Sequence, residues 1–309
     1  MRLGVLDVGS NTVHLLLVDA HQGSAPVPAS KLKMPLRMAE HLGVDGTVDE
    51  AAVVELIAFI ERGQQLAEDM GATELMAFAT SAIRDAPNGD EVLDRIHDAT
   101  NLRIDVLSGD DEARMTFLAV RRWFGWSTGR LLVVDIGGGS LELAAGDDEA
   151  PDVAVSLPLG AGRMTRQFLS HDPPSAHEVR ELRRHVRASI ADVVGRVRRV
   201  GEPRIAAATS KTLRQLARIA GAAPSSDGIY VRRTLSRQAL AEWTPRLAEM
   251  SATQRETLPG VSAARSRQLV AGAIVAEASM ELLEIEELVI CPWAMREGII
   301  LQRIDWLST

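Results

Sequence analysis

The feature that most constrains the fold is a stretch of sequence that occurs twice. The segment "LGVLDVGSNTVHLLLVD" from residue 3 aligns with "LLVVDIGGGSLELAAGD" from residue 131, at an offset of 128 residues. In both copies an apolar run meets an aspartate, Asp7 or Asp135, and a glycine-containing turn then leads into a second apolar segment. A repeated order of strand, acid, turn and strand favours two copies of one supersecondary unit. We therefore expect two related halves.

Strand-like and helical patterns alternate along the rest of the chain, which is typical of an α/β fold. A chain of 309 residues also suits two domains better than one. We place the domains at 1–121 and 122–309 and expect a ligand in the cleft between them, because such clefts are common binding sites. Helical spacing covers 51–70, 90–100, 176–200 and 266–283. Strand patterns cover 102–108, 153–157, 204–209 and 288–292, and 74–86 fits a strand that runs into a turn and helix.

Composition narrows the classes of protein. With 46% hydrophobic and 25% charged residues the chain resembles an ordinary globular protein, and no apolar window is long enough for a membrane span. The single cysteine, Cys291, leaves no internal disulfide, and no signal-peptide core precedes Asp7, so we expect a cytoplasmic protein without a membrane partner. A net charge of −8 argues against nucleic acid as a partner. The arginine-rich helix at 176–200 fits either a solvated face or a track for a long anion.

The glycine turns are candidate phosphate sites. Gly137, Gly138, Gly139 and Ser140 form a stretch whose backbone N–H groups can approach an anion closely, although a tight hairpin turn explains the same residues. The matching turn of the first copy adds hydroxyl and amide donors, namely Ser10, Asn11 and Thr12. Two such turns favour a two-sided clamp on phosphate.

The acids beside these turns favour a divalent cation. Asp7 and Asp135 either cap their own turns or hold a metal ion. A carboxylate 4 Å from a bound phosphate would repel it by about 4 kcal/mol per pair of unit charges in a protein-surface dielectric. A Mg²⁺ or Mn²⁺ ion held by carboxylates, water and phosphate oxygens removes this conflict.

A third acidic segment is "SGDDEAR" at 108–114, which follows a predicted strand. The carboxyl ends of strands are where α/β sheets place ligands. Asp110, Asp111 and Glu112 fit the acidic first turn of a helix, and this explains two of the three. Glu112, together with Glu142, is the candidate for orienting or deprotonating an attacking water.

Five motifs together resemble the exopolyphosphatase and guanosine pentaphosphate phosphohydrolase (Ppx/GppA) family, a branch of the actin and sugar-kinase superfamily. They occur in the family's order over nearly the whole chain, so the resemblance is specific. It implies two actin-like (ribonuclease H-like) α/β domains with the active site in the interdomain cleft. The motifs are "DVGSNT" at Asp7, "ATSAIRDAPN" at Ala79, "SGDDEA" at Ser108, "DIGGGSLE" at Asp135 and "MREG" at Met295.

The resemblance also implies roles for single residues. Glu112 corresponds to the family's catalytic base, Glu142 to its second essential glutamate and Asp135 to its metal-associated aspartate. Arg84 corresponds to the arginine that holds substrate phosphates, a task that suits the planar guanidinium, although an ion pair with Asp85 or Asp90 is the alternative. The phosphate-binding turns correspond to Ser10, Asn11, Gly137, Gly138, Gly139 and Ser140.

Three features depart from the family pattern. Asp111 replaces a glutamate, and Lys211 stands in "ATSKT" where the family has a glycine, so that it either contacts substrate phosphate or starts a helix. The chain is also expected to be a short form without the C-terminal helical domain of long members. This leaves the preferred chain length of the substrate open.

The expected activity is hydrolysis of a phosphoanhydride bond, releasing the terminal orthophosphate of inorganic polyphosphate with Mg²⁺ or Mn²⁺ as cofactor. Guanosine pentaphosphate (pppGpp) is the closest rival substrate, and pppGpp or ppGpp is a further candidate ligand. A superfamily kinase or ATPase needs a nucleotide pocket, for which "VAGAIVAEA" near Gly272 is ambiguous evidence. A non-catalytic sensor of these nucleotides gains nothing from Glu112 and Glu142. The family resemblance also suggests a homodimer.

Overall fold

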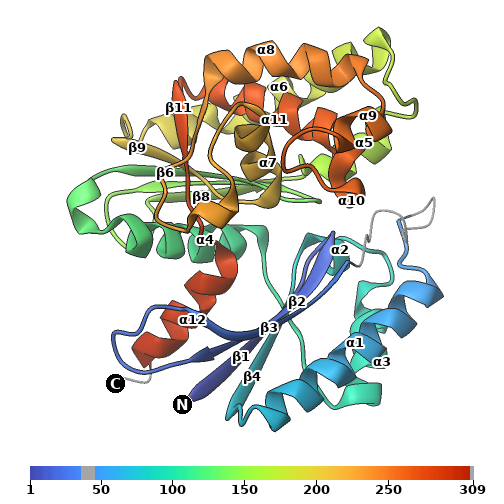
Figure 1. The fold of residues 1–309 in the computed structure, drawn as a ribbon, viewed down its shortest axis with the longest axis vertical. Helices are drawn as coiled ribbons and strands as arrows, with labels where there is room; N and C mark the ends of the chain where they lie inside the picture. Colours follow the sequence, from blue (N-terminus) through green and yellow to red (C-terminus); the bar gives the residue numbers. More distant parts are fainter. Residues whose placement is uncertain (36–45, 307–309) are drawn as a thin grey trace. The chain divides into compact units, whose positions relative to one another are not determined.

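The computed structural model describes residues 1–35 and 46–306, which form two compact units (Figure 1). The first unit comprises Met1–Ser108 and the segment from Met295, and the second comprises Gly109–Ala294. These limits differ from the expected domains 1–121 and 122–309. Helix α4 (Gly109–Phe124) packs on the sheet of the second unit, whereas α12 (Met295–Trp306) contacts the first strand of the first unit.

The first unit is a mixed five-stranded sheet in the order β3-β2-β1-β4-β5, with helices packed on it. The first three strands pair antiparallel, whereas β4 and β5 continue the sheet in parallel. Leu56, Phe59 and Ile60 of α1 lie in its hydrophobic core. The elements are β1 (Arg2–Val8), β2 (Thr12–Asp19), β3 (Pro28–Pro35), α1 (Glu50–Asp69), β4 (Glu74–Ala79), α2 (Ser81–Arg84), α3 (Gly89–Thr100) and β5 (Asp105–Val106).

The second unit is a mixed six-stranded sheet in the order β10-β11-β9-β6-β7-β8. Its strands are β6 (Leu131–Ile136), β7 (Leu141–Gly146), β8 (Val153–Leu157), β9 (Ile205–Ala208), β10 (Thr234–Ser236) and β11 (Glu287–Ile290). Besides α4, its helices are α5 (Ala161–Phe168), α6 (Ala176–Arg198), α7 (Lys211–Ile219), α8 (Arg237–Glu249), α9 (Ala252–Glu256), α10 (Ala263–Ser266) and α11 (Leu269–Leu282). The α/β class expected from the sequence is confirmed.

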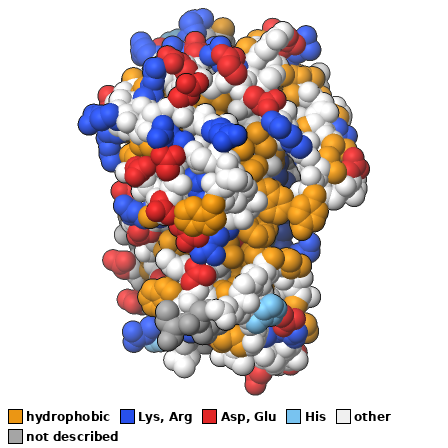
Figure 2. Space-filling view, turned by 90° about the vertical axis from the view of Figure 1, so that its left-hand side faces the viewer, with side chains coloured by type: hydrophobic (Ala, Val, Ile, Leu, Met, Phe, Trp, Pro, Cys, Tyr) orange, Lys and Arg blue, Asp and Glu red, His pale blue; other side chains and the backbone are white. Residues whose placement is uncertain are grey.

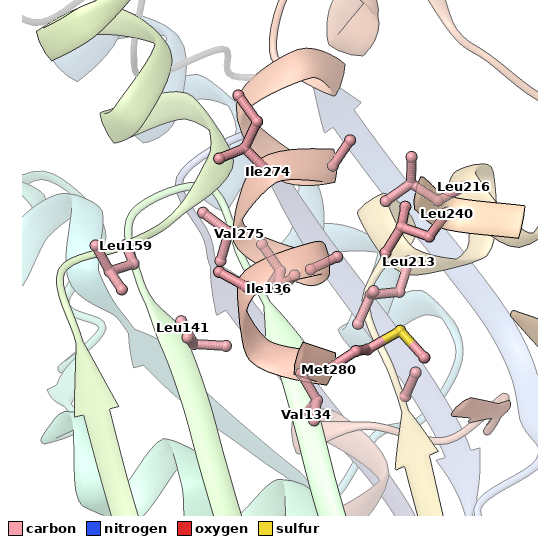
Figure 3. Packing of buried hydrophobic residues seen from close by; sticks show 14 of the residues in the cluster. Val134, Ile136, Leu141, Leu159, Leu213, Leu216, Leu240, Ile274, Val275 and Met280 are labelled. Carbon is pink, nitrogen blue, oxygen red and sulfur yellow. The ribbon is translucent and has the colours of Figure 1, made fainter. Parts of the chain in front are cut away.

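Helix α11 is the centre of the second unit's main core. It contacts α5, α6, α7 and α8, and Ile274, Val275 and Met280 project from it into the hydrophobic cluster (Figure 3). A helix that is apolar around most of its circumference belongs in a protein interior. A Cβ atom on Gly272 would lie 2.5 Å from Cγ2 of Thr212, so this glycine allows α11 to approach α7. Close packing therefore accounts for the "VAGAIVAEA" segment.

The internal repeat predicted from the sequence has a structural counterpart in each sheet. Strands β1 and β2 form an antiparallel pair in which Asp7 faces His14, and β6 and β7 form a pair in which Asp135 faces Glu142. The next neighbours also correspond, because β4 lies parallel to β1 and β9 lies parallel to β6.

Every position of strand β7 is buried. Leu141 and Leu143 lie in the cluster around α6 and α11, whereas Ala144 lies in a separate cluster with Phe117 of α4. Helices thus cover both faces of this strand, and Glu142 belongs to the face that α4 covers.

The surface carries interspersed basic and acidic side chains on the face shown in Figure 2. Four arginines of α6 are paired with glutamates: Arg183 with Glu277, Arg184 with Glu181, Arg187 with Glu281 and Arg198 with Glu284. These pairs support the interpretation of 176–200 as a solvated, ion-paired face. No helix among residues 1–35 and 46–306 has the length and apolar character needed to cross a membrane.

Candidate active site

Three carboxylates of the second unit form what we call the acid cluster: Glu112, Asp135 and Glu142. Asp135 and Glu142 are direct partners across β6 and β7, and side chains of such partners share one face of a sheet. Glu112 lies in the first turn of α4, which packs on β6, β7 and β8. Glu112 and Glu142 are only 8% and 6% exposed. The fold thus collects acids that lie 30 residues apart in sequence.

Of the three acids at the start of α4, Glu112 is buried, whereas Asp110 and Asp111 are exposed. Asp111 accepts a hydrogen bond at 3.2 Å from Nη1 of Arg114, one turn further along the helix. Such exposed contacts stabilise little. The two aspartates therefore match the helix-start interpretation, and Glu112 is the one of the three acids that is buried.

Hydroxyl groups from neighbouring strands fix the acid cluster. Thr209 donates a hydrogen bond to Oδ2 of Asp135 at 2.6 Å, and Ser156 donates to Oε1 of Glu142 at 2.9 Å. The Ser140 side chain also hydrogen-bonds Glu142. The sequence analysis selected Ser140 but not Thr209 or Ser156. Thr209 had a signal, because it is the last residue of the strand-like run at 204–209, whereas Ser156 had none.

Burial and mutual repulsion disfavour charge on two of these acids. The pKa of Glu142 is raised well above its usual value, first by burial and then by the charges of Glu112 and Asp135. Burial also raises the pKa of Asp135, although the Thr209 hydrogen bond and the nearby Arg214 and Arg265 oppose the shift. Perturbed acids of this kind are typical of functional sites. A cation bound beside them would relieve the repulsion.

Two arginines that sequence reasoning did not select lie near Asp135. Burial and the neighbouring Arg214 lower the pKa of Arg265 to about 10, and Asp135 opposes that shift. Arg214 is on α7 and its Nε donates to the Ser210 carbonyl at 3.0 Å. Arginines suit phosphate because their donors match its oxygens. The carboxylates of the acid cluster therefore repel one another, but arginine side chains near Asp135 offset part of this repulsion.

The glycine turn closes the β6–β7 hairpin, so Gly137–Gly139 form a hairpin turn, as one of the two interpretations predicted. The N–H of Gly137 donates to the Ser140 carbonyl at 2.9 Å, and the carbonyls of Gly137 and Gly138 accept from the N–H groups of Ala161 and Arg163. Within the described part of the chain, no protein acceptor meets the N–H groups of Gly138 and Gly139. These two donors fit the anion-binding role.

Gly160 supports this turn and was not identified from the sequence. A Cβ atom at this position would lie 2.3 Å from the Gly139 carbonyl carbon and 2.3 Å from the Ser140 nitrogen. Because real Cβ atoms do not approach backbone this closely, only glycine fits. The residue before α5 therefore packs directly against the backbone of the glycine turn.

In the first unit, the residues of the "DVGSNT" turn form a compact set of their own. Oγ of Ser10 lies 3.1 Å from Oγ of Ser81, Oγ1 of Thr12 lies 2.9 Å from Nε2 of His14, and Asn11 is buried. Asp7 has Nε of Arg296, in the "MREG" motif, at 3.9 Å. The structure thus brings the first and last motifs together.

Arg84 and Lys211 have protein partners. Arg84 donates to Oδ1 of Asp85 at 3.1 Å, which is the alternative considered for it, and to the Leu107 carbonyl at 2.8 Å. Lys211 is the first residue of α7, and its Nζ donates to Oγ of Ser262 at 3.1 Å. Their phosphate-binding roles remain predictions.

Asp7 in the first unit and Asp135 in the second each offer carboxylate oxygens, the ligand type that Mg²⁺ prefers. Among the described residues, however, no group of three or more His, Cys, Asp or Glu side chains is arranged to hold a metal ion by itself. Mg²⁺ commonly uses one or two carboxylates and completes its shell with water and substrate phosphate. A single carboxylate such as Asp135 meets that requirement within the second unit.

Comparisons with known proteins agree with these motifs. A model of the Ppx/GppA phosphatase family matches residues 17–306. Relatives include Exopolyphosphatase 1 of Mycobacterium tuberculosis, 53% identical over 99% of this chain and 89% of the relative, and Exopolyphosphatase 1 of Mycobacterium leprae, 52% identical over 99% and 90%.

Solved structures show the same fold. An Aquifex aeolicus member of the Ppx/GppA family has a TM-score of 0.83 at 23% identity, over 100% of this chain and 99% of that one. An exopolyphosphatase from Cytophaga hutchinsonii has a TM-score of 0.88 at 21% identity, over 99% and 98%. The expected actin-like fold is confirmed. The chain belongs to the Ppx/GppA phosphatase family.

Proposed function

We propose that this protein is an exopolyphosphatase, which releases the terminal orthophosphate of inorganic polyphosphate by attack of water. The observation that carries the proposal is the buried acid cluster beside a glycine turn with two N–H donors. Membership of the Ppx/GppA family and curated relatives named Exopolyphosphatase 1 support it.

In the proposed reaction, water attacks the terminal phosphorus while the bond from phosphorus to the bridging oxygen breaks. Glu112 accepts the proton of the water, and the shortened polyphosphate leaves with the bridging oxygen. The charge of Glu112 raises the pKa of Glu142, so the two carboxyl groups lie close together and Glu142 shares this task. The N–H groups of Gly138 and Gly139 bind oxygens of the terminal phosphate.

The remaining predicted residues take supporting roles in this proposal. In the first unit, Ser10, Asn11, Thr12 and Arg84 would bind substrate phosphates and Asp7 would offer a metal ligand. In the second unit, Asp135 would hold Mg²⁺ or Mn²⁺. The bound ion supplies positive charge that offsets repulsion between substrate phosphates and carboxylates. Removal of divalent ions with a chelator should therefore abolish phosphate release, and addition of Mg²⁺ should restore it.

The raised pKa of Glu142 argues against a purely binding function. Carboxylates that repel one another would also repel phosphate and so weaken binding in a protein that only senses a nucleotide. The proposed hydrolysis, in contrast, uses them. The close packing of Gly272 against Thr212 accounts for this glycine without a kinase-type nucleotide pocket.

The test is phosphate release from polyphosphates of defined length in Mg²⁺, with pppGpp assayed in parallel. We expect a higher kcat/KM for polyphosphate. Preference for pppGpp would assign the chain to guanosine pentaphosphate hydrolysis instead. Tight binding of ppGpp or pppGpp without turnover of any substrate would reject the enzymatic proposal.

A further inference from the structure

Arg121, near the end of α4, is a buried arginine that the proposed reaction does not use. It is 0% exposed, and its guanidinium donates to three backbone carbonyls: Nε to Asp148 at 3.1 Å, Nη1 to Gly129 at 2.8 Å and Nη2 to Gly146 at 3.0 Å. Gly146 is the last residue of β7, Gly129 precedes β6, and Asp148 lies in the turn between β7 and β8. One side chain thus ties the end of α4 to the strands on which this helix packs.

The bonds of Arg121 are directional and fully use a buried charge. Burial lowers the pKa of Arg121, and the charges of Asp147, Asp148 and Glu149 oppose that shift. The planar fork of a guanidinium can donate to several fixed acceptors at once, whereas the ammonium of lysine is a compact point charge on a flexible stem. A buried charge that loses its partners is strongly destabilising. The three carbonyls therefore hold the end of α4 in one place.

The apolar contacts of α4 give weaker control over its position. Ala113 and Phe117 of α4 belong to the same cluster as Ala144 of β7, and four of the nine buried residues of that cluster are alanines. Small side chains form shallow ridges, and the hydrophobic effect is not directional. The polar bonds of Arg121 are therefore the contacts that best resist sliding or rolling of α4 on the sheet.

The tie at Arg121 and the acid cluster lie at matching distances along α4 and β7. Arg121 follows Glu112 by nine helical residues, a rise of about 14 Å. Gly146 follows Glu142 by four strand residues, which is again about 14 Å. Because α4 packs on β7, the bond from Arg121 to Gly146 at one end brings the two glutamates level at the other.

We propose that Arg121 is a positioning residue: it sets the register of α4 on β7 and thereby holds Glu112 beside Glu142. This proposal rests on the proposed function, because Arg121 acts through the candidate base of that reaction. Arg121 is itself about 14 Å along the helix from Glu112 and takes no part in proton transfer. A shift of about 1 Å in a reacting group lowers rates about 100-fold, so a small slide of α4 is sufficient.

The first test compares Arg121→Lys with Glu112→Gln and with the double variant, using a polyphosphate of defined length. Arg121→Lys cannot bond all three carbonyls, so kcat should fall about 10- to 100-fold. KM should stay within about twofold, because the N–H donors of Gly138 and Gly139 are unchanged. In the Glu112→Gln background, Arg121→Lys should lower kcat less than about threefold, because the base through which it acts is already absent.

The matched control is Leu182→Ala, which removes a buried side chain of α6 from the other cluster of the same unit. It should lower the melting temperature but leave kcat within about twofold in both backgrounds when rates are measured well below melting. If Arg121→Lys does not fold, Arg121→Gln provides a variant without a buried charge. Wild-type kcat in the folded Arg121 variant, equal losses of kcat with and without Glu112, or a loss confined to KM would overturn the proposal.

A stability measurement without substrate separates this proposal from the proposed function. In the metal-free protein at pH 8, Glu112→Gln and Glu142→Gln should together raise the melting temperature by less than the sum of their separate effects, because each removes the same repulsion. In the Arg121→Lys background this shortfall should fall to about half or less, because the two carboxylates move apart. If the wild type hydrolyses no polyphosphate, the proposed function fails while the shortfall still reports the register of α4. An unchanged shortfall in Arg121→Lys would contradict the positioning role, whatever the activity of the wild type.

Discussion

Asp135 and Glu142 face each other across β6 and β7, whereas the equivalent pair of the first unit is Asp7 and His14. The repeat therefore provides two similar hairpins, but only the second pairs acid with acid. Glu112 adds a further charge to that pair. The first hairpin instead combines Asp7 with an imidazole whose Nε2 contacts Thr12. We therefore expect proton transfer in the proposed reaction to depend on the acids of the second unit.

Replacing Glu112 with Gln should lower the rate of phosphate release by about 10²- to 10⁴-fold, the usual contribution of a positioned general base. The amide has nearly the same size, so the helix should keep its packing. Initial rates with Mg²⁺ and a defined polyphosphate measure the effect, and circular dichroism checks the fold.

The matched control for Glu112→Gln is Asp111→Asn, which changes the neighbouring exposed acid that contacts Arg114. It should retain most of the wild-type activity. Normal hydrolysis by Glu112→Gln would remove the proposed base, and equal losses in both variants would point to the helix start rather than to Glu112.

Replacing Ser156 with Ala should move the acidic limb of the pH profile of kcat/KM to higher pH. The Ser156 hydroxyl favours the charged form of Glu142, so its loss raises the pKa of that carboxyl further. A hydrogen bond to a charged group typically corresponds to about one pKa unit or somewhat more. Ser156→Thr should keep the original profile.

Ser189→Ala provides the control for Ser156→Ala, because it removes an exposed serine hydroxyl that bonds the His185 carbonyl on α6. An unchanged acidic limb in Ser156→Ala, or a shift of the same size in the control, would show that Ser156 does not set the charge of Glu142.

The sequence predicted much of the fold because the repeat and the hydrophobic spacing report local structure directly. The first hairpin, the basic helix at 176–200 and the strand at 153–157 follow patterns that hold within a short window. The limits of the two units could not be predicted in the same way. Long-range packing assigns α4 to the second unit and α12 to the first, and no local sequence pattern encodes such packing. The continuous burial of β7 has the same origin, since helices distant in sequence cover it.

For the candidate site, the sequence identified the charged residues of the motifs but not the residues that contact and position them. Glu112, Asp135 and Glu142 stand beside turns and strand ends, where chemistry is expected. Ser156 and Arg265 become relevant only through strand register and helix packing, which place them beside Glu142 and Asp135. Gly160 could not be recognised from spacing, because its contact is with a turn 20 residues earlier.

Replacing Glu142 with Gln should raise the melting temperature of the metal-free protein more at pH 8 than at pH 5. Glu142 holds its proton more tightly in the folded than in the unfolded state, where its pKa is near 4.5. Its contribution to stability is thus present below pH 4.5 and lost as pH rises through the raised pKa. Each kcal/mol of repulsion removed corresponds to about 2–4 °C.

Scanning calorimetry in chelator at both pH values measures this difference between Glu142→Gln and wild type. Asp147→Asn is the control, because Asp147 is an exposed acid that pairs with Arg130. A gap between variant and wild type that narrows from pH 5 to pH 8 would contradict the buried, repelled state of Glu142.

Replacing Gly160 with Ala should destabilise the second unit and impair catalysis, although the backbone angles of Gly160 suit alanine (φ −65°, ψ 147°). The new Cβ would overlap the backbone of Gly138 to Ser140, so the glycine turn must move. Overpacking typically costs about 1–3 kcal/mol, and displacement of phosphate-binding groups by about 1 Å lowers rates about 100-fold. Gly195→Ala is the matched control: it lies on α6 with no atom within 4 Å of the added Cβ and should stabilise the helix by about 0.5–1 kcal/mol. Chemical denaturation and phosphate release measure both effects, and a Gly160→Ala enzyme with wild-type activity would show that α5 does not position the turn.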